Sequence, residues 1–112
     1  MVLPIAGPDL KGKLDRRDDI VIVDARARED YLIDHIPGAF SLLNMEVEQK
    51  AEGLLPRGVP VVVYSNDADC PASGLVAGKL DGMGFGPVFD YNDSYADWKE
   101  RGYPLESGPP EV

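Results

Sequence analysis

The chain has 112 residues, 44% of them hydrophobic, which is enough for one compact domain with its own core. Its net charge of −9 argues against nucleic acid and against an anionic membrane surface, because both ligands require a basic patch. One cysteine and one histidine exclude an internal disulfide framework and predict neither a metal site nor a cofactor. No segment is long and apolar enough for a membrane span or a signal sequence, so we expect the cytoplasm.

Strand and helix signals alternate along the chain. The predicted extended segments are residues 20–23, 39–42, 61–64 and 87–91, and the predicted helices are residues 27–33, 45–55, 71–83 and 94–101. Pro71 suits the first turn of its helix, Ser94 is expected to cap the last one, and Gly102 is expected to end it. We expect Trp98 to pack in the core.

The strands are apolar throughout, with runs of β-branched residues at 20–23 and 61–63. Such strands, alternating with helices, predict an α/β fold with a mostly parallel sheet covered on both faces. Ligands in these sheets bind where the strands end, and Asp24 and the loop 65–70 both fall at such ends. We expect a single domain over residues 1–106, followed by a flexible tail over 107–112.

Cys70 is the first candidate for chemistry. It precedes a predicted helix, whose N-terminal N–H groups favour a thiolate. Asp67 and Asp69 act against this, since like charges disfavour a thiolate and repel anionic substrates. No Lys or Arg occurs between Ser65 and Lys79 to offset these carboxylates. Asp69 is also placed to cap the helix.

Several short segments match one family pattern in order and spacing. They are Val23-Asp24-Ala25-Arg26, Glu29 and Tyr31, His35-Ile36-Pro37-Gly38-Ala39, Val61-Val62-Val63-Tyr64, Gly84-Phe85, Val88, Trp98 and Gly102-Tyr103-Pro104. Together they resemble the rhodanese-like domain over roughly residues 8 to 105. The resemblance implies a three-layer α/β sandwich around a mostly parallel five-stranded sheet.

The resemblance also implies a sulfurtransferase that carries sulfur as a cysteine persulfide, held by inward-pointing loop N–H groups and often by an Arg. Ser65 stands at the usual nucleophile position and is a poor substitute, because its hydroxyl is not ionised near neutral pH. Cys70 is therefore the candidate nucleophile. The implied active-site loop is Ser65, Asn66, Asp67, Ala68, Asp69, Cys70 and Pro71, with Asp24, Arg26 and His35 in support.

Structural roles are expected for the supporting residues. Asp24 should contact the loop backbone or Arg26, and His35 should make a structural hydrogen bond. The loop itself should curl into a cup of converging N–H groups with the thiol at its rim.

Two other functions remain open at this point. One is an inactive rhodanese-like module that binds or regulates a partner, and the other is a redox-sensing thiol. A phosphatase ranks lower, because its loop would need a basic group. The corresponding partners are a small sulfur donor, such as thiosulfate or a persulfide, or a basic protein surface.

Overall fold

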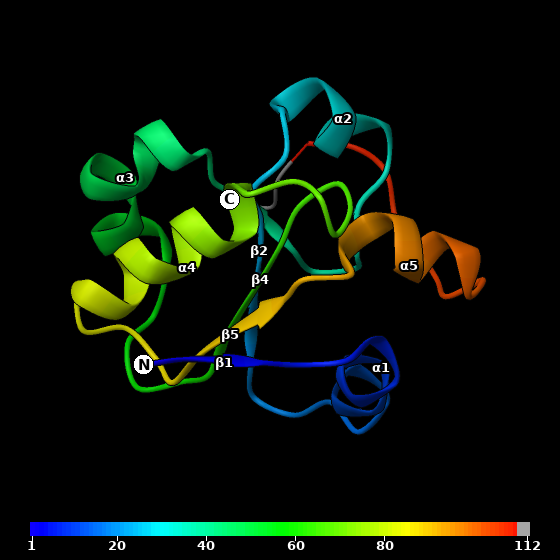
Figure 1. Cartoon of the computed structure of the whole chain (residues 1–112), viewed down its shortest axis with the longest axis horizontal. Helices are drawn as coiled ribbons and strands as arrows, with labels where there is room; N and C mark the ends of the chain where they lie inside the picture. The colour runs from blue at the N-terminus through cyan, green and yellow to red at the C-terminus, as the bar shows by residue number, and fades with distance from the viewer. Residues whose placement is uncertain (110–112) are drawn as a thin grey trace.

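A computed structural model describes residues 1–109, and its centre is a parallel sheet (Figure 1). The five strands are β1 (Val2–Pro4), β2 (Val21–Asp24), β3 (Phe40–Ser41), β4 (Val61–Tyr64) and β5 (Val88–Tyr91). The helices are α1 (Gly7–Asp15), α2 (Arg28–Ile33), α3 (Val47–Leu54), α4 (Ala72–Gly82) and α5 (Ser94–Glu100), with a 3₁₀ turn η1 (Asn44–Glu46) before α3.

The sheet has the strand order β1-β5-β4-β2-β3, and every neighbouring pair is parallel. The C-terminal ends of all five strands therefore lie along the same side of the sheet, which we call the edge where the strands end. In register, Asp24 lies beside Tyr64, and Tyr64 lies beside Tyr91, so the last residues of the three central strands meet at this edge.

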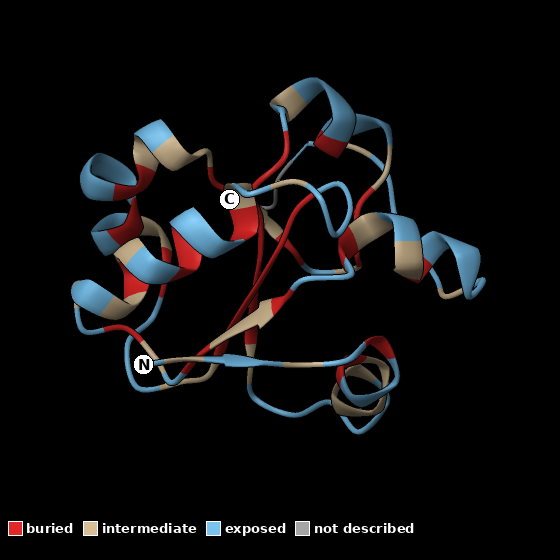
Figure 2. Cartoon of the chain, in the orientation of Figure 1, coloured by how far each residue is buried: buried red, intermediate tan, exposed pale blue. Residues whose placement is uncertain are grey.

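Each face of the sheet buries its own apolar cluster. Figure 2 shows that β2 and β4, in the middle of the sheet, consist of buried residues. Alternate strand residues supply the two clusters, as the pleat requires. Val61 and Val63 face α3 and α4, whereas Val62 and Tyr64 face the opposite side, with α1, α2 and α5. The predicted α/β class and three-layer arrangement are confirmed. Trp98 is fully buried, as expected.

The first 15 residues form two elements that the sequence patterns did not predict. β1 is three residues long, lies at the edge of the sheet and exposes two of its residues, so it shows no buried-strand pattern. α1 contains Gly7 and Gly12 and lacks a strong apolar stripe. Gly7 is needed for packing, since a Cβ there would lie 2.7 Å from Asp97 Oδ2 and 2.8 Å from the Tyr91 hydroxyl.

Two predicted helices differ in detail. The segment 45–55 divides into η1 and α3. The prediction that Ser94 caps α5 is wrong, because Asp93 is the N-cap and Ser94 is the first helical residue, with a φ of +64°. The Ser94 hydroxyl accepts from Ser65 N and donates to the Tyr91 carbonyl.

Residues after α5 return to the turn at His35. The backbones of His35 and Glu106 pair in an antiparallel bridge, and Gly108 N donates to the Leu32 carbonyl. Of the expected tail, residues 110–112 lie outside the described residues. Among residues 1–109, no helix combines the length and apolarity that crossing a bilayer demands.

Candidate functional site

The candidate site lies at the edge where the strands end. β2 ends at Asp24 and β4 ends at Tyr64, and the loop 65–71 leads from β4 into α4 (Figure 1). The structure therefore brings the predicted Asp24 and the predicted loop to neighbouring strand ends, in agreement with the parallel topology.

Asp24 and Arg26 form a buried ion pair, which confirms the expected contact. Their side chains are 0% and 3% exposed, and Arg26 Nη2 donates to Asp24 Oδ2 at 2.9 Å. The backbone N–H of Arg26 also donates to Asp24 Oδ1 at 2.9 Å, and the Tyr64 hydroxyl donates to Oδ2 at 2.5 Å. Burial and the neighbouring carboxylate hold the pKa of Tyr64 well above its usual range.

Contacts of Arg26 and Tyr64 also connect these strand ends to the turn after α2 and to α5. Arg26 Nη2 donates to the Asp34 carbonyl at 2.6 Å, and Ile36 N donates to the Tyr64 hydroxyl at 3.1 Å. The Arg26 guanidinium stacks over the Tyr95 ring at 4.2 Å. These structural contacts occupy the guanidinium, so it is not free to bind an anionic sulfur species.

His35 has a structural environment. Its ring stacks on Tyr31 with centroids 3.9 Å apart and is 2% exposed. Nδ1 lies 2.8 Å from the Tyr31 carbonyl, and Nε2 lies 3.3 Å from Glu106 Oε2. Both ring nitrogens are thus occupied, and the expected structural hydrogen bond is present.

The loop after β4 is held by the first turn of α5. Ser65 N donates to Ser94 Oγ at 3.0 Å, and Tyr95 N donates to the Ser65 carbonyl at 3.0 Å. Ala96 N donates to the Asn66 carbonyl at 2.9 Å. These bonds fix the start of the loop from outside it, so its conformation does not depend on the loop residues alone.

Cys70 is partly exposed and lies against Ser65. Its Sγ is 2.9 Å from Ser65 Oγ. The hydrogen bond from Ser65 lowers the pKa of the thiol, with burial acting against it and the N–H groups of Ala72 and Asn66 adding to the lowering. The charge of Asp67 raises the pKa, but the net direction is downward.

The exposed side of the loop is acidic. Asp67 and Asp69 are both exposed, and Asp67 Oδ1 accepts from Asp69 N at 3.0 Å. Asp69 does not cap α4, whose N-cap is Pro71. Lys79, the next basic residue along the chain, is occupied by the Asn44 carbonyl and Glu48.

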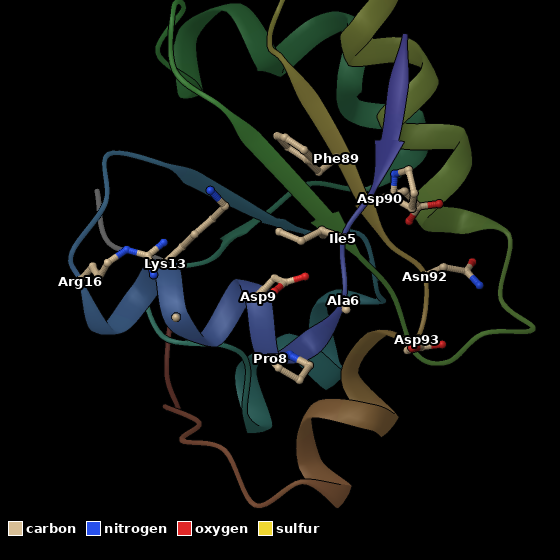
Figure 3. Close-up of a pocket in the computed structure, with 12 residues that line it drawn as sticks. Ile5, Ala6, Pro8, Asp9, Lys13, Arg16, Phe89, Asp90, Asn92 and Asp93 are labelled. Carbon is tan, nitrogen blue, oxygen red and sulfur yellow. The ribbon is translucent and has the colours of Figure 1, made fainter.

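A groove of about 800 Å³ lies elsewhere, between α1 and the β1 edge of the sheet (Figure 3). Ile5 and Phe89 supply its apolar lining, and Asp9, Lys13 and Arg16 supply its charged lining. None of its lining residues belongs to the loop 65–71. The groove is therefore separate from the thiol.

Comparison with known proteins points to one class of fold and one family. The family model described as "Rhodanese-like domain" matches residues 8–101. The uncharacterised protein YibN of Escherichia coli strain K12 is 32% identical over 99 residues, which are 86% of this chain and 67% of YibN.

Solved structures agree with this match. The rhodanese-like domain of Alr3790 from Anabaena sp. has a TM-score of 0.83 at 25% identity, covering 96% of this chain and 80% of that one. The thiosulfate sulfurtransferase of Pseudomonas aeruginosa has a TM-score of 0.78 at 26% identity, covering 98% of this chain but 21% of that one.

The fold is thus the parallel three-layer sandwich of rhodaneses. This chain belongs to the rhodanese-like domain family.

The sequence did not reveal the contact between Ser65 and Cys70. The two residues are five positions apart in an irregular loop, where spacing does not fix a distance. The role of Ser94 was also missed, because a serine before a helical pattern normally indicates a cap. The available signal is a loop serine five residues before the single cysteine, which the family pattern identifies only as a replacement at the nucleophile position.

Proposed function

We propose that the domain is a sulfurtransferase that carries sulfur as a persulfide on Cys70. The observation that carries the proposal is the partly exposed Cys70 thiol, 2.9 Å from a buried hydroxyl, with its pKa lowered. A lowered pKa raises the fraction of thiolate, which is the nucleophile. The resemblance to a thiosulfate sulfurtransferase supports the same class of reaction.

The reaction is an exchange at sulfur. The Cys70 thiolate attacks the outer sulfur of a donor persulfide, R–S–SH, forming a new S–S bond while the donor S–S bond breaks. The donor leaves as the thiolate RS⁻, and the protein holds Cys70–S–SH. Atoms, protons and charge balance, and no external oxidant is needed. An acceptor thiolate or cyanide removes the outer sulfur and regenerates the Cys70 thiolate.

Charge indicates which donors fit. Asp67 and Asp69 present negative charge beside the thiol, and Arg26 is sequestered by Asp24. Thiosulfate carries two negative charges and is repelled. A neutral or positively charged persulfide, including one on a basic protein, fits better.

A binding module is the second candidate, and the same charges favour it. The carboxylates of Asp67 and Asp69 are exposed and form no ion pair with any residue in the described range 1–109. They are available to a basic partner surface whether or not Cys70 turns over.

The test is sulfur transfer to cyanide, measured as thiocyanate. Wild type is compared with Cys70→Ala, using thiosulfate and cysteamine persulfide as donors and free glutathione as the background thiol. We expect turnover above that background, faster with the cationic donor, and its complete loss in Cys70→Ala. Transfer no faster than glutathione with either donor would favour the binding module.

A further inference from the structure

Ser65 is a fully buried residue whose hydroxyl meets the thiol. Its exposed fraction is 0%, and within the described range its Oγ bonds to Cys70 Sγ, at 2.9 Å. Burying a hydroxyl is costly unless it is hydrogen-bonded, so the bond to sulfur is the contact that compensates for this burial. Ser65 therefore makes a contact of its own with the thiol and is not only a replacement at the nucleophile position.

The backbone of Ser65 is fixed on both sides. Its N–H donates to Ser94 Oγ at 3.0 Å, and its carbonyl accepts from Tyr95 N at 3.0 Å. The Ser94 hydroxyl donates in turn to the Tyr91 carbonyl at 2.9 Å, which links the loop to the end of β5. Ser94 takes a φ of +64°, a conformation that residues other than glycine rarely adopt. The fold thus maintains an unusual backbone conformation where it holds Ser65.

We infer that Ser65 is a positioning residue for sulfur transfer, whose hydroxyl donates a hydrogen bond to the Cys70 thiolate and orients it for attack. This inference deepens the proposed function and rests on it. The hydroxyl neither gains nor loses a proton overall, and it forms no bond to sulfur. It stabilises the anion before attack, as a hydrogen bond to a charged group does.

Charged groups around Cys70 do not provide this stabilisation. Within the loop, the ionisable neighbours are Asp67 and Asp69, which disfavour a thiolate. The first turn of α4, residues 72–75, contains no ionisable side chain, and residues 94–96 of α5 contain one, the phenol of Tyr95, whose pKa is raised by burial and by its hydrogen bond to Asp34. Asp93, which precedes α5, is a further carboxylate. Neutral donors, with Ser65 the foremost, must therefore hold the thiolate.

The experiment measures the rate of Cys70 alkylation by iodoacetamide from pH 5 to 10, in wild type and in Ser65→Ala. The chain has one cysteine, so the signal has a single source. We expect the midpoint of the pH profile to move upward in Ser65→Ala, and the rate at pH 7 to fall by roughly 3- to 10-fold, the effect of one hydrogen bond. Sulfur transfer from cysteamine persulfide should fall in parallel.

Ser73→Ala is the matched control. Ser73 is also buried, at 1% exposure, and lies in the first turn of α4, but its Oγ has no hydrogen-bond partner among the described residues. Its removal should leave the alkylation profile unchanged. Ser65→Thr, which keeps the hydroxyl, should restore most of the wild-type profile, and thermal unfolding shows whether each variant is folded.

An unchanged profile in Ser65→Ala, or an equal shift in Ser73→Ala, would overturn the inference. The alkylation assay uses no sulfur donor, so it separates the two proposals. A wild type that shows the Ser65-dependent profile but takes up no sulfur would refute the proposed function while retaining the hydrogen bond. Sulfur uptake without the Ser65 effect would refute the positioning role alone.

Discussion

Two polar clusters lie at the same edge of the sheet and differ in how completely their groups are paired. The first, which we term the buried frame, comprises Asp24, Arg26 and Tyr64, and its charges are paired and hidden from water. The second is the pair Ser65 and Cys70, which is partly open and borders exposed carboxylates. Tyr64 and Ser65 are adjacent in the sequence, yet Tyr64 belongs to the buried frame and Ser65 to the candidate site.

The difference shows how one strand end can serve both stability and chemistry. Successive strand residues point to opposite faces, so Tyr64 turns toward Asp24 while the chain leaves the sheet at Ser65. The guanidinium of Arg26 is held inside the buried frame by Asp24. The open pair must therefore stabilise a thiolate with neutral donors, and this favours sulfur partners without negative charge.

The largest effect is expected from breaking the frame with Arg26→Met. This change leaves the Asp24 carboxylate buried without its cation, and we expect the free energy of unfolding to fall by about 3 to 5 kcal/mol. Urea denaturation measures it. The control is Arg16→Met, which removes an exposed pair with Asp18 and should cost less than about 1 kcal/mol. Equal effects of the two substitutions would contradict the distinction between a frame and a solvated surface.

An intermediate effect is expected at Glu46, which is less buried than the frame and more buried than the exposed carboxylates of the loop. Burial raises the pKa of Glu46, but hydrogen bonds from Lys50, Leu43 N and Arg28 together lower it to about 2. A folded-state pKa below the unfolded value adds stability above the unfolded pKa. That stability is lost as the pH falls from about 4.5 toward 2.

We expect about 1 to 2 kcal/mol from Glu46, because its partners Arg28 and Lys50 are 37% and 52% exposed and water screens them. Unfolding as a function of pH measures this contribution. Glu46→Gln should lower stability at pH 7 and flatten the acid limb of the curve. An acid limb as steep as that of wild type would show that other carboxylates account for it.

The smallest effect is expected at the exposed rim of the open pair. Asp67→Asn removes a charge that opposes the Cys70 thiolate, so alkylation at pH 7 should accelerate by about 2- to 4-fold at low salt. The gain should shrink in 0.5 M salt. Asp19→Asn is the matched control, since Asp19 is also exposed but precedes β2, at the end of the sheet where the strands begin. A gain that salt does not reduce would point to a change in loop conformation instead.

The sequence was sufficient to predict the parts of the fold that depend on local patterns. The apolar runs of β2 and β4 and the spacing of Val76 and Leu80 in α4 follow from burial alone, and the topology then places Asp24 beside the loop. β1 was not predictable, since it is held by pairing with β5 and not by its own residues.

The detailed site was less predictable, because it depends on contacts distant in sequence. Ser94 is 29 residues from Ser65, and only the folded chain shows that its hydroxyl receives the Ser65 N–H. The charges of Asp67 and Asp69 are visible in the sequence, so the expectation of an unfavourable thiolate was reasonable. It was incomplete, because the compensating hydroxyl of Ser65 reaches Cys70 only through the loop conformation.

The most direct test of the central claim is the intact mass of the protein after incubation with cysteamine persulfide. Persulfide formation on Cys70 predicts a gain of one sulfur atom, located on the peptide that contains Cys70, removed by a thiol reductant and absent in Cys70→Ala. An unchanged mass under conditions that saturate a free thiol with sulfur would contradict the claim.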